Sequence, residues 1–489
     1  MKKINSARTT IYALYYLYLP LALFLINWVK LPIGLPLAVI TGVMPLWVCR
    51  NLDNHIINIP RRKFLVTIGV LLIWVLLSGV GGYVWQNRWD HFFRNAVFND
   101  LMQRPWPVCE GNDVLCYYIG FWLPPALAAK ATGNLDIGWF GQFIYACIGI
   151  FLAFRLTIEK VGNLKLRYLL PFIFFSGLDI IGFPLSGAVL DHTLHIELWS
   201  ELAAWESNTT LLNWVYNQAI PSWVATMLIL SYGPRKGVSA LTLCFLSISA
   251  PFSVVGLFPL AVYYIGAAAL RAGSVRSALA EVFAPANIIA VLAILPVIAY
   301  MSLNTKTAVH IGFWNLSPAG WIWSFILLIG LEILIFLPFI YRQIARSPEF
   351  YILFTTSVAS LILIMGTTSD FNSRIELPLN YFMTLQIIIF ISRWETVTRI
   401  IRFSFLAVSL LAAVTPSLEI ARILYMTARK PQMEYRSFQE PTIFQFRLLR
   451  HNFVADSVLN STETPPALTI LNYPDPQDSR PGATHIDNR

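Results

Sequence analysis

The sequence predicts an all-helical protein that crosses a membrane many times. Apolar residues make up 56% of its 489 residues and charged residues only 12%, and long apolar runs recur along the whole chain. A run of about 18 or more apolar residues can cross a hydrocarbon layer of roughly 30 Å as a helix. These runs lack the alternation of polar and apolar residues that is typical of barrel strands. The sequence therefore favours a polytopic bundle of helices, whose backbone groups are hydrogen-bonded internally.

The apolar runs predict about 13 transmembrane helices, within a range of 11 to 14. The apolar stretch after MKKINSAR is too long for a signal peptide and lacks a small-residue cleavage site, so it is expected to be an uncleaved first span. Some of the shorter segments are candidates for half-spans that pack inside the bundle. The predicted segments are 10–28, 33–49, 64–86, 137–156, 168–187, 216–232, 238–251, 253–270, 284–303, 318–341, 350–366, 379–392 and 403–419.

The placement of Lys and Arg predicts the orientation of these helices. If the N-terminus is inside, the inner connections hold most of the basic residues, as the positive-inside rule requires. This pattern accounts for the formal net charge of +9 without a nucleic-acid partner, and it places the C-terminus outside. The inner connections are then 1–9, 50–63, 155–167, 233–237, 271–283, 342–349 and 393–402.

The chain then divides into three parts. Residues 1–63 form an extra N-terminal transmembrane hairpin, and residues 64–419 form the main transmembrane core. Residues 420–489 lose the apolar periodicity and form a small C-terminal segment on the outer face. Its end, rich in Pro, Asp and Arg, is expected to be disordered. The outer face also receives three loops with polar and aromatic residues, at 87–136, 188–215 and 366–378.

The first outer loop opens with a carboxylate at the boundary of a span. Asp90 begins a stretch in which Phe92, Phe93, Ala96 and Val97 have partial helical spacing. An amphipathic helix of this kind would lie along the membrane surface and hold Asp90 beside Arg94, one turn later. The plainer interpretation is a solvated acid at the end of a span.

The stretch WDHFFRNAVFNDLMQRPWPV, followed by YYIGFWLPPAL, resembles the first outer loop of GT-C-fold integral membrane glycosyltransferases. The resemblance implies transfer of a sugar from a polyprenyl-phosphate carrier to a glycan, lipid or protein acceptor, on the outer face of the cell inner membrane. It implies a catalytic role for Asp90 and a phosphate-binding role for Arg94. The family's common Asp-Glu pair is Asp90-His91 here, so His91 is a candidate contact for sugar or acceptor. No cofactor is certain, and a divalent cation is left open.

Arg374 is the preferred clamp for the carrier phosphate, because a guanidinium can bind phosphate with two parallel hydrogen bonds. The alternative is a structural ion pair of Arg374 with Asp370 or Glu376.

The 188–215 segment alternates acids with tryptophans, which suits a sugar-binding cleft and equally suits an interfacial helix. Glu197, Trp199 and Trp205 are its candidate sugar or acceptor contacts. His192, His195 and Glu201 match no zinc signature, so no metal site is predicted.

Asp179 lies within a predicted span, where an ionisable group is costly and indicates function by default. As a coupling acid it would fit a rival class, a secondary transporter or lipid-carrier flippase. A polysaccharide polymerase or ligase is a second alternative. Cys109 and Cys116 bracket a polar loop that would close as a disulfide in an oxidising compartment.

Overall fold

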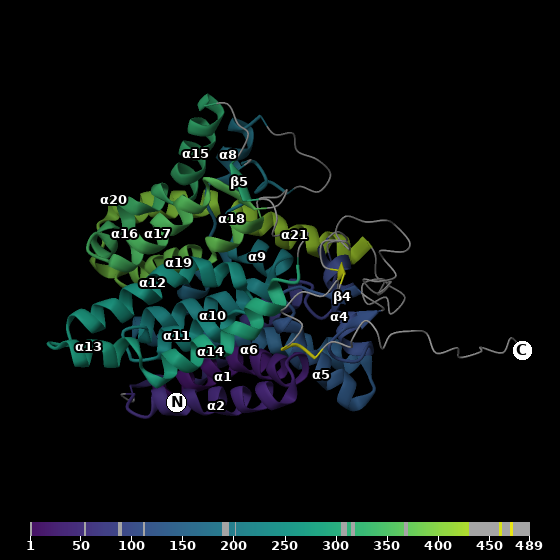
Figure 1. Ribbon diagram of the computed structural model, residues 1–489. Helices are drawn as coiled ribbons and strands as arrows, with labels where there is room; N and C mark the ends of the chain where they lie inside the picture. The colour runs from purple at the N-terminus through teal and green to yellow at the C-terminus, as the bar shows by residue number, and fades with distance from the viewer. Residues whose placement is uncertain are drawn as a thin grey trace, which may run out of the picture.

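The computed structural model is an all-helical bundle (Figure 1). It describes residues 2–52, 55–86, 90–110, 113–187, 195–200, 202–304, 311–313, 318–365, 370–429, 459–461 and 470–472. Eight helices within these residues are long and apolar enough to cross a membrane. The chain is therefore a membrane-embedded helical protein, as its composition predicts.

Each of the 13 predicted apolar segments contains at least one helix. Ten segments hold a single helix: α1 (Ser6–Trp28), α2 (Leu31–Cys49), α3 (Arg61–Leu77), α6 (Leu135–Val161), α10 (Tyr216–Tyr232), α11 (Val238–Leu246), α12 (Pro251–Leu270), α14 (Pro285–Met301), α17 (Pro348–Ser360) and α19 (Leu377–Ser392). The other three hold two helices in succession: α7 (Leu169–Phe174) and α8 (Asp179–Leu185), α15 (Pro318–Glu332) and α16 (Leu337–Ile344), and α20 (Arg399–Ala412) and α21 (Val414–Arg429).

Short elements occupy the connections. The short helices are α4 (Asp90–Gln103), α5 (Leu123–Thr132), α9 (Asn208–Trp214), α13 (Val275–Val282) and α18 (Asp370–Ile375), with single 3-10 turns at Gly120–Trp122, Leu166–Tyr168, Leu334–Phe336 and Trp394–Thr396. The strands are β1 (Lys2–Asn5) with β2 (Ile56–Ile59), β3 (Cys109–Glu110) with β4 (Asp113–Leu115) and β7 (Leu459–Ser461), and β5 (Ile311–Phe313) with β6 (Leu363–Met365). All of these strand pairs are antiparallel.

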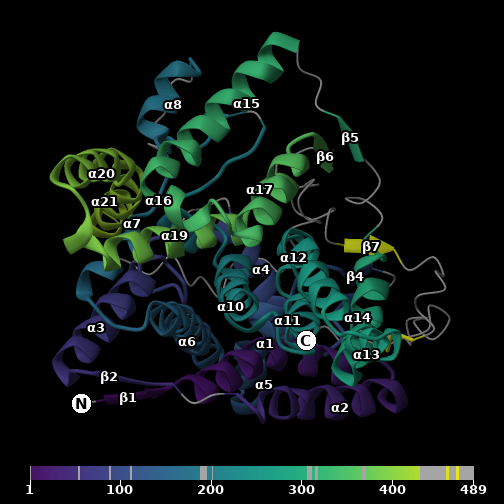
Figure 2. The ribbon, with the colours of Figure 1, turned by 90° about the vertical axis from the view of Figure 1, so that its left-hand side faces the viewer.

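The long helices α1, α2, α6, α10, α11 and α14 run side by side in Figure 1, and α16, α17, α19 and α20 form a second group beside them. Figure 2 shows the same bundle from the side that carries the N-terminus. Helix α1 packs against α2, α6, α10 and α11 and is largely buried, whereas few residues of α2 are buried. Apart from α1, the core lies around α10 and α19, whose residues are nearly all buried.

The basic connections meet at one end of the bundle, which we call the basic end. The N-terminus and the connections after α2, α6, α10, α12 and α19 contact one another there through side chains. The contacts are Arg155 to Asn5, Arg235 to Asn51, Lys236 to Glu281, Lys165 to Ser392 and Arg167 to Glu395. Segments far apart in the sequence thus share one face of the bundle.

Several of the other connections meet at the opposite end, where Figure 1 shows α4 and α5. Strand β7 pairs with β4 at this end, and Val29 forms a bridge with Leu471. These two short pieces of the C-terminal segment are the parts of it that the structure describes beyond Arg429. Further contacts are His91 to Asn213, Cys116 to Tyr300 and Asn372 to Leu202.

Two boundaries differ clearly from the prediction. Helix α3 ends at Leu77, well before residue 86, because Gly79, Gly81 and Gly82 adopt positive φ angles that turn the chain. The last helix continues to Arg429 because a buried face that includes Thr415, Glu419 and Ile423 packs against the bundle. Residues 420–429, which were predicted to belong to the C-terminal tail, are therefore part of this helix.

Helix α4 begins at Asp90, as predicted, but it is not amphipathic in the expected way. All residues from Arg94 to Met102 are buried, together with His91. A helix with buried residues on all sides packs within the protein instead of resting one face on a membrane surface. The prediction of a surface helix is therefore wrong, although the helix itself is present.

Gly149 is expected to be essential for the packing of three core helices. A Cβ atom there would lie 2.3 Å from Ile220 Cγ2 of α10 and 2.4 Å from the hydroxyl of Tyr16 in α1. Gly149→Ala should therefore destabilise the protein by about 1–3 kcal/mol through overpacking. The measurement is thermal or denaturant unfolding in detergent.

Gly69→Ala is the matched control, because a Cβ at Gly69 in α3 meets no atom within 4 Å. This change should be neutral or slightly stabilising, since Ala favours a helix more than Gly does. Equal effects of the two substitutions would contradict the role given to Gly149.

Candidate functional site

The start of α4 is fixed by the glycine turn that ends α3. Gln86 donates from its amide to the carbonyl of Gly79 at 2.7 Å, and Asn95 donates to Gln86 Oε1 at 2.8 Å. Gly81 also donates its backbone N–H to Gln142 of α6 at 3.1 Å. These hydrogen bonds hold the N-terminal half of α4 against the end of the bundle.

Asp90 and Arg94 form an ion pair across that first turn. Arg94 Nη2 lies 3.3 Å from Asp90 Oδ1, and the Asp90 side chain is 32% exposed whereas that of Arg94 is 6% exposed. The Nε and Nη1 atoms of Arg94 are buried and have no hydrogen-bond partner among the described residues. A buried guanidinium with unfilled donors is costly unless a ligand or water satisfies them.

Tyrosines surround the guanidinium of Arg94. Burial by itself lowers the pKa of Arg94. The charge of Asp90 together with the nearby tyrosines has a larger effect, so the pKa is raised above its usual value. These tyrosines are Tyr117, Tyr118 and Tyr216. Tyr117 donates to the hydroxyl of Tyr118, and Tyr216 accepts from Trp122 and Gln142. The guanidinium is therefore a permanent positive charge in an aromatic, hydroxyl-lined environment.

His91 is buried, and its surroundings favour the neutral imidazole. Its Nε2 lies 2.5 Å from the carbonyl oxygen of Asn213, and its ring stacks on Tyr216 with centroids 5.6 Å apart. Burial and the charge of Arg94 lower the pKa of His91 to about 3. A carbonyl accepts, so Nε2 carries the proton; Nδ1 is buried without a partner among the described residues.

Arg374 lies in a buried ion pair away from Asp90. Its Nη1 is 2.6 Å from Glu206 Oε2, and both side chains are less than 10% exposed. Burial raises the pKa of the neighbouring Glu376 well above its usual value; the charge of Glu206 raises it further and that of Arg374 opposes the shift. The geometry favours the structural ion pair over the phosphate clamp, with Glu206 as a partner that the sequence did not predict. The side chain of Asp370 lies outside the described residues.

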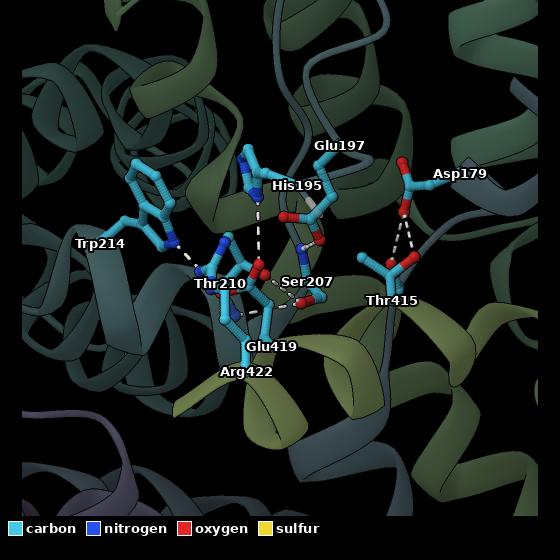
Figure 3. A network of polar contacts seen from close by, with 10 residues as sticks. Asp179, His195, Glu197, Ser207, Thr210, Trp214, Thr415, Glu419 and Arg422 are labelled. Atoms are coloured by element: carbon cyan, nitrogen blue, oxygen red, sulfur yellow. Dashed lines mark hydrogen bonds and ion pairs between the residues drawn. The ribbon is translucent and has the colours of Figure 1, made fainter. Parts of the chain in front are cut away.

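Asp179 accepts several hydrogen bonds within the bundle, and Figure 3 shows it beside Thr415. Its Oδ2 accepts from Ser176 at 2.9 Å and from Thr415 at 3.0 Å, and its Oδ1 accepts from Trp199 Nε1 at 3.0 Å. Glu332 of α15 is also hydrogen-bonded to Asp179. The carboxylate at the start of α8 thus links α8 to α15 and α21.

The three predicted sugar contacts in the 188–215 segment are buried instead of lining an open cleft. Trp199 packs its ring on Gly182, and Glu197 Oε1 accepts from the backbone N–H of Ser207 at 2.8 Å. Burial, reinforced by Asp179 and Glu419, raises the pKa of Glu197 well above its usual value. Trp205 lines a small cavity with Glu206, Glu332 and other residues. The cavity has a volume of about 20 Å³, which is enough for one water molecule.

A second group of polar contacts was not predicted from the sequence. His195 Nδ1 lies 3.1 Å from Glu419 Oε1, and Arg422 pairs with the other oxygen of Glu419 (Figure 3). The His195 ring stacks on Trp214 at 4.6 Å, and the Arg422 guanidinium lies 5.5 Å from the Trp214 ring centroid. The sequence signal for this group was the spacing of Glu419 and Arg422, which lie three residues apart in the last apolar helix and can form an ion pair.

Helix α9 connects the two groups of residues. Asn213 near its end contacts His91, and Trp214 Nε1 donates to Glu419 at 3.3 Å. The structure therefore brings Asp90, His91 and Arg94 together, and separately gathers Asp179, Glu197 and Trp199. Arg374 and Trp205 lie around Glu206, beside the second group.

Cys109 and Cys116 are both free, so the disulfide that their spacing allows is absent. Cys109 lies opposite Val114 in the β3–β4 pair, whereas the thiol of Cys116 is buried and donates to the carbonyl of Tyr300 at 3.1 Å. The two side chains are engaged in different places. Burial raises the pKa of Cys116 to about 12, so it is held as a thiol.

No group of three or more His, Cys, Asp or Glu side chains that could hold a metal ion occurs among the described residues. His192 and Glu201, which the sequence places near His195, lie outside the described residues. No family model, no curated protein and no solved structure matches this chain.

Acid sensitivity should depend on His91. Because the folded pKa is about 3 and the unfolded one is 6.5, the unfolded state binds more protons between these values, and stability falls as the pH drops from about 6.5 towards 3. At pH 5 this linkage costs about 2 kcal/mol. His91→Gln keeps a donor for Asn213 and should flatten the pH dependence by that amount, measured by unfolding at pH 7.5 and pH 5. An unchanged pH slope would show that His91 is not held neutral.

The Arg374–Glu206 pair should behave as one energetic unit. Arg374→Met leaves Glu206 buried without this cation and should cost about 3–5 kcal/mol, whereas the Arg374→Met/Glu206→Gln double variant should cost much less than the sum of the two single changes. Denaturant unfolding of all four proteins measures this coupling. The Lys236–Glu281 pair, which is about one third exposed, is the control and should couple by less than about 1 kcal/mol. Strict additivity for Arg374 and Glu206 would contradict the pairing.

Proposed function

We propose that this protein is an integral membrane glycosyltransferase that moves a sugar from a polyprenyl-phosphate carrier to an acceptor hydroxyl, at the end of the bundle that carries α4. One observation carries the proposal. The partly exposed carboxylate of Asp90 lies beside the buried guanidinium of Arg94, two of whose nitrogens have no partner among the described residues. A base next to an unfilled phosphate-binding donor is the pair of groups that this reaction needs.

The proposed chemistry is a single displacement at the anomeric carbon. Asp90 takes the proton from the acceptor hydroxyl as its oxygen bonds to the anomeric carbon, and the bond to the carrier phosphate breaks. The leaving phosphate takes the bonding electron pair, and Arg94 stabilises the charge that develops on it. A direct displacement inverts the anomeric centre. Arg374 has no part in this scheme, because Glu206 occupies its guanidinium.

We further propose that the chain makes 13 crossings, with its N-terminus inside and its C-terminus outside. Support comes from the basic end, where Lys and Arg of the N-terminus and of several connections lie together. Basic connections favour the cytoplasmic side. Asp90 and Arg94 then lie at the outer end, where a lipid-linked sugar carried across the inner membrane presents its phosphate.

A secondary transporter or lipid-carrier flippase is the rival candidate, and the pair of Asp179 with Glu332 favours it. Their carboxyl groups are buried and share a hydrogen bond, so one of them must hold a proton. Proton-binding carboxyl groups within candidate membrane spans are typical of proton-coupled carriers. Against this, Ser176, Thr415 and Trp199 also satisfy Asp179, as a structural role requires.

Asp90→Asn should abolish sugar transfer. The purified protein in nanodiscs is supplied with polyprenyl-phosphate sugars and cell-envelope extract as the acceptor source, and release of free carrier phosphate is measured. Removal of the base should lower the rate at least about 100-fold, and Arg94→Gln should lower it by about 100- to 1,000-fold.

Asp136→Asn, at an exposed carboxylate in the first turn of α6, is the matched control and should leave the rate unchanged. Full turnover by Asp90→Asn would refute the catalytic assignment. Proton-coupled substrate uptake into vesicles that is lost with Asp179→Asn, without carrier release, would support the transporter instead.

A further inference from the structure

Helix α13 is the one helix of its length or longer, within the described part of the chain, in which no residue is buried. Val275, Leu279 and Val282 recur at helical spacing on one face, and Val275 is 79% exposed. Phe283 continues this face directly after the helix and is 61% exposed. The apolar face therefore has no partner among the described residues.

The polar face of α13 is anchored to the rest of the protein. Glu281 pairs with Lys236 at 3.2 Å, and Asn287 donates to the carbonyls of Glu281 and Val282 at 3.0 and 3.1 Å. Ser274 caps the first turn by accepting from the N–H of Ser277. These contacts fix the orientation of α13. Because they lie on its polar side, the apolar face points away from the protein.

The neighbours of α13 define what its apolar face meets. It connects α12 and α14, which expose apolar side chains such as Phe258, Val262 and Leu295. Helix α12 is a candidate membrane span, and the next candidate span, Val275–Met301, contains both α13 and α14. The α-helix is interrupted between Val282 and Pro285, so α13 is a separate helix from α14. The exposed apolar surface of α12 and α14 thus continues onto α13 at the basic end, where α13 projects from the bundle (Figure 1). A lipid-facing surface that turns onto a short amphipathic helix ends at the level of the headgroups.

The basic residues in and beside α13 favour anionic lipids. Arg271 and Arg276 are both exposed and flank the apolar face. Glu281, the acidic residue of α13, forms an ion pair with Lys236. Basic residues near a membrane surface gain about 1 kcal/mol each from anionic lipids.

We propose that α13 is an interfacial helix that inserts its Val275–Leu279–Val282 face into the membrane surface at the basic end and binds anionic phospholipid headgroups through Arg271 and Arg276. The proposal is independent of the reaction at α4. It assigns a lipid-binding surface to a connection that has no role in the proposed transfer.

Hydrogen–deuterium exchange of residues 271–283 tests the proposal with the full chain in nanodiscs of phosphatidylcholine alone or mixed equally with phosphatidylglycerol. The amides of α13 should exchange at least about fivefold more slowly in the anionic nanodiscs, since two arginines contribute. Arg271→Gln/Arg276→Gln should remove this difference. Leu279→Ser/Val282→Ser should speed exchange in both lipids.

Ala280→Ser, on the exposed polar face, is the matched control and should behave as the unaltered protein. Unchanged exchange in α1 confirms that each variant is folded. Equal exchange of α13 in the two lipids would overturn the proposal. So would protection that follows the number of protein copies per nanodisc instead of the lipid, since a second copy would then cover the face.

Discussion

The fold depends on how the backbone groups at a break between α7 and α8 are hydrogen-bonded. Between α7 and α8 the chain leaves the helix at Phe175, which frees backbone carbonyls inside an apolar bundle. Irregular backbone at membrane depth is tolerated only where the protein itself supplies the missing hydrogen bonds. Helix α9 supplies them. Asn208 donates to the carbonyls of Phe172 and Phe175, and Thr209 donates to that of Ile173.

This constraint explains why α9 lies inside the protein and why both candidate sites depend on it. Asn208 also donates to Thr384 of α19, and Thr209 accepts from Trp74 of α3. With its start fixed in this way, the end of α9 presents the Asn213 carbonyl to His91 and the Trp214 indole to Glu419. The positions of α4 and α21 are therefore coupled through α9, a helix of seven residues.

Much of the bundle follows from local sequence properties. Apolar length predicts where the helices lie, and Asp90 marks the start of α4, because both depend on residues within a few turns. The sequence does not predict which polar groups meet. Arg374 meets Glu206 and Asp179 meets Thr415 across 168 and 236 residues, and such choices depend on tertiary packing. The burial of α4 was missed for the same reason: its polar residues Asn95 and Asn99 are enclosed by other helices, which helical periodicity within α4 does not reveal.

Asp179 and Arg374 differ from Arg94 in how their charged atoms are paired, and this difference supports the proposal that the reaction takes place at α4. Asp179 accepts hydrogen bonds from three donors, and Arg374 is held by Glu206, so both stabilise the packing of helices. Arg94 has one carboxylate partner that remains partly exposed, and buried nitrogens that no described residue fills. Arg167 and Glu197 also have buried atoms without a partner among the described residues. Arg94 combines such atoms with a nearly complete burial of its side chain and a partly exposed carboxylate partner, and unfilled buried donors are costly. Binding of a phosphate there would recover that cost, which is why the α4 site, and not the more acidic network beneath it, is the better candidate for transfer from a phosphate carrier.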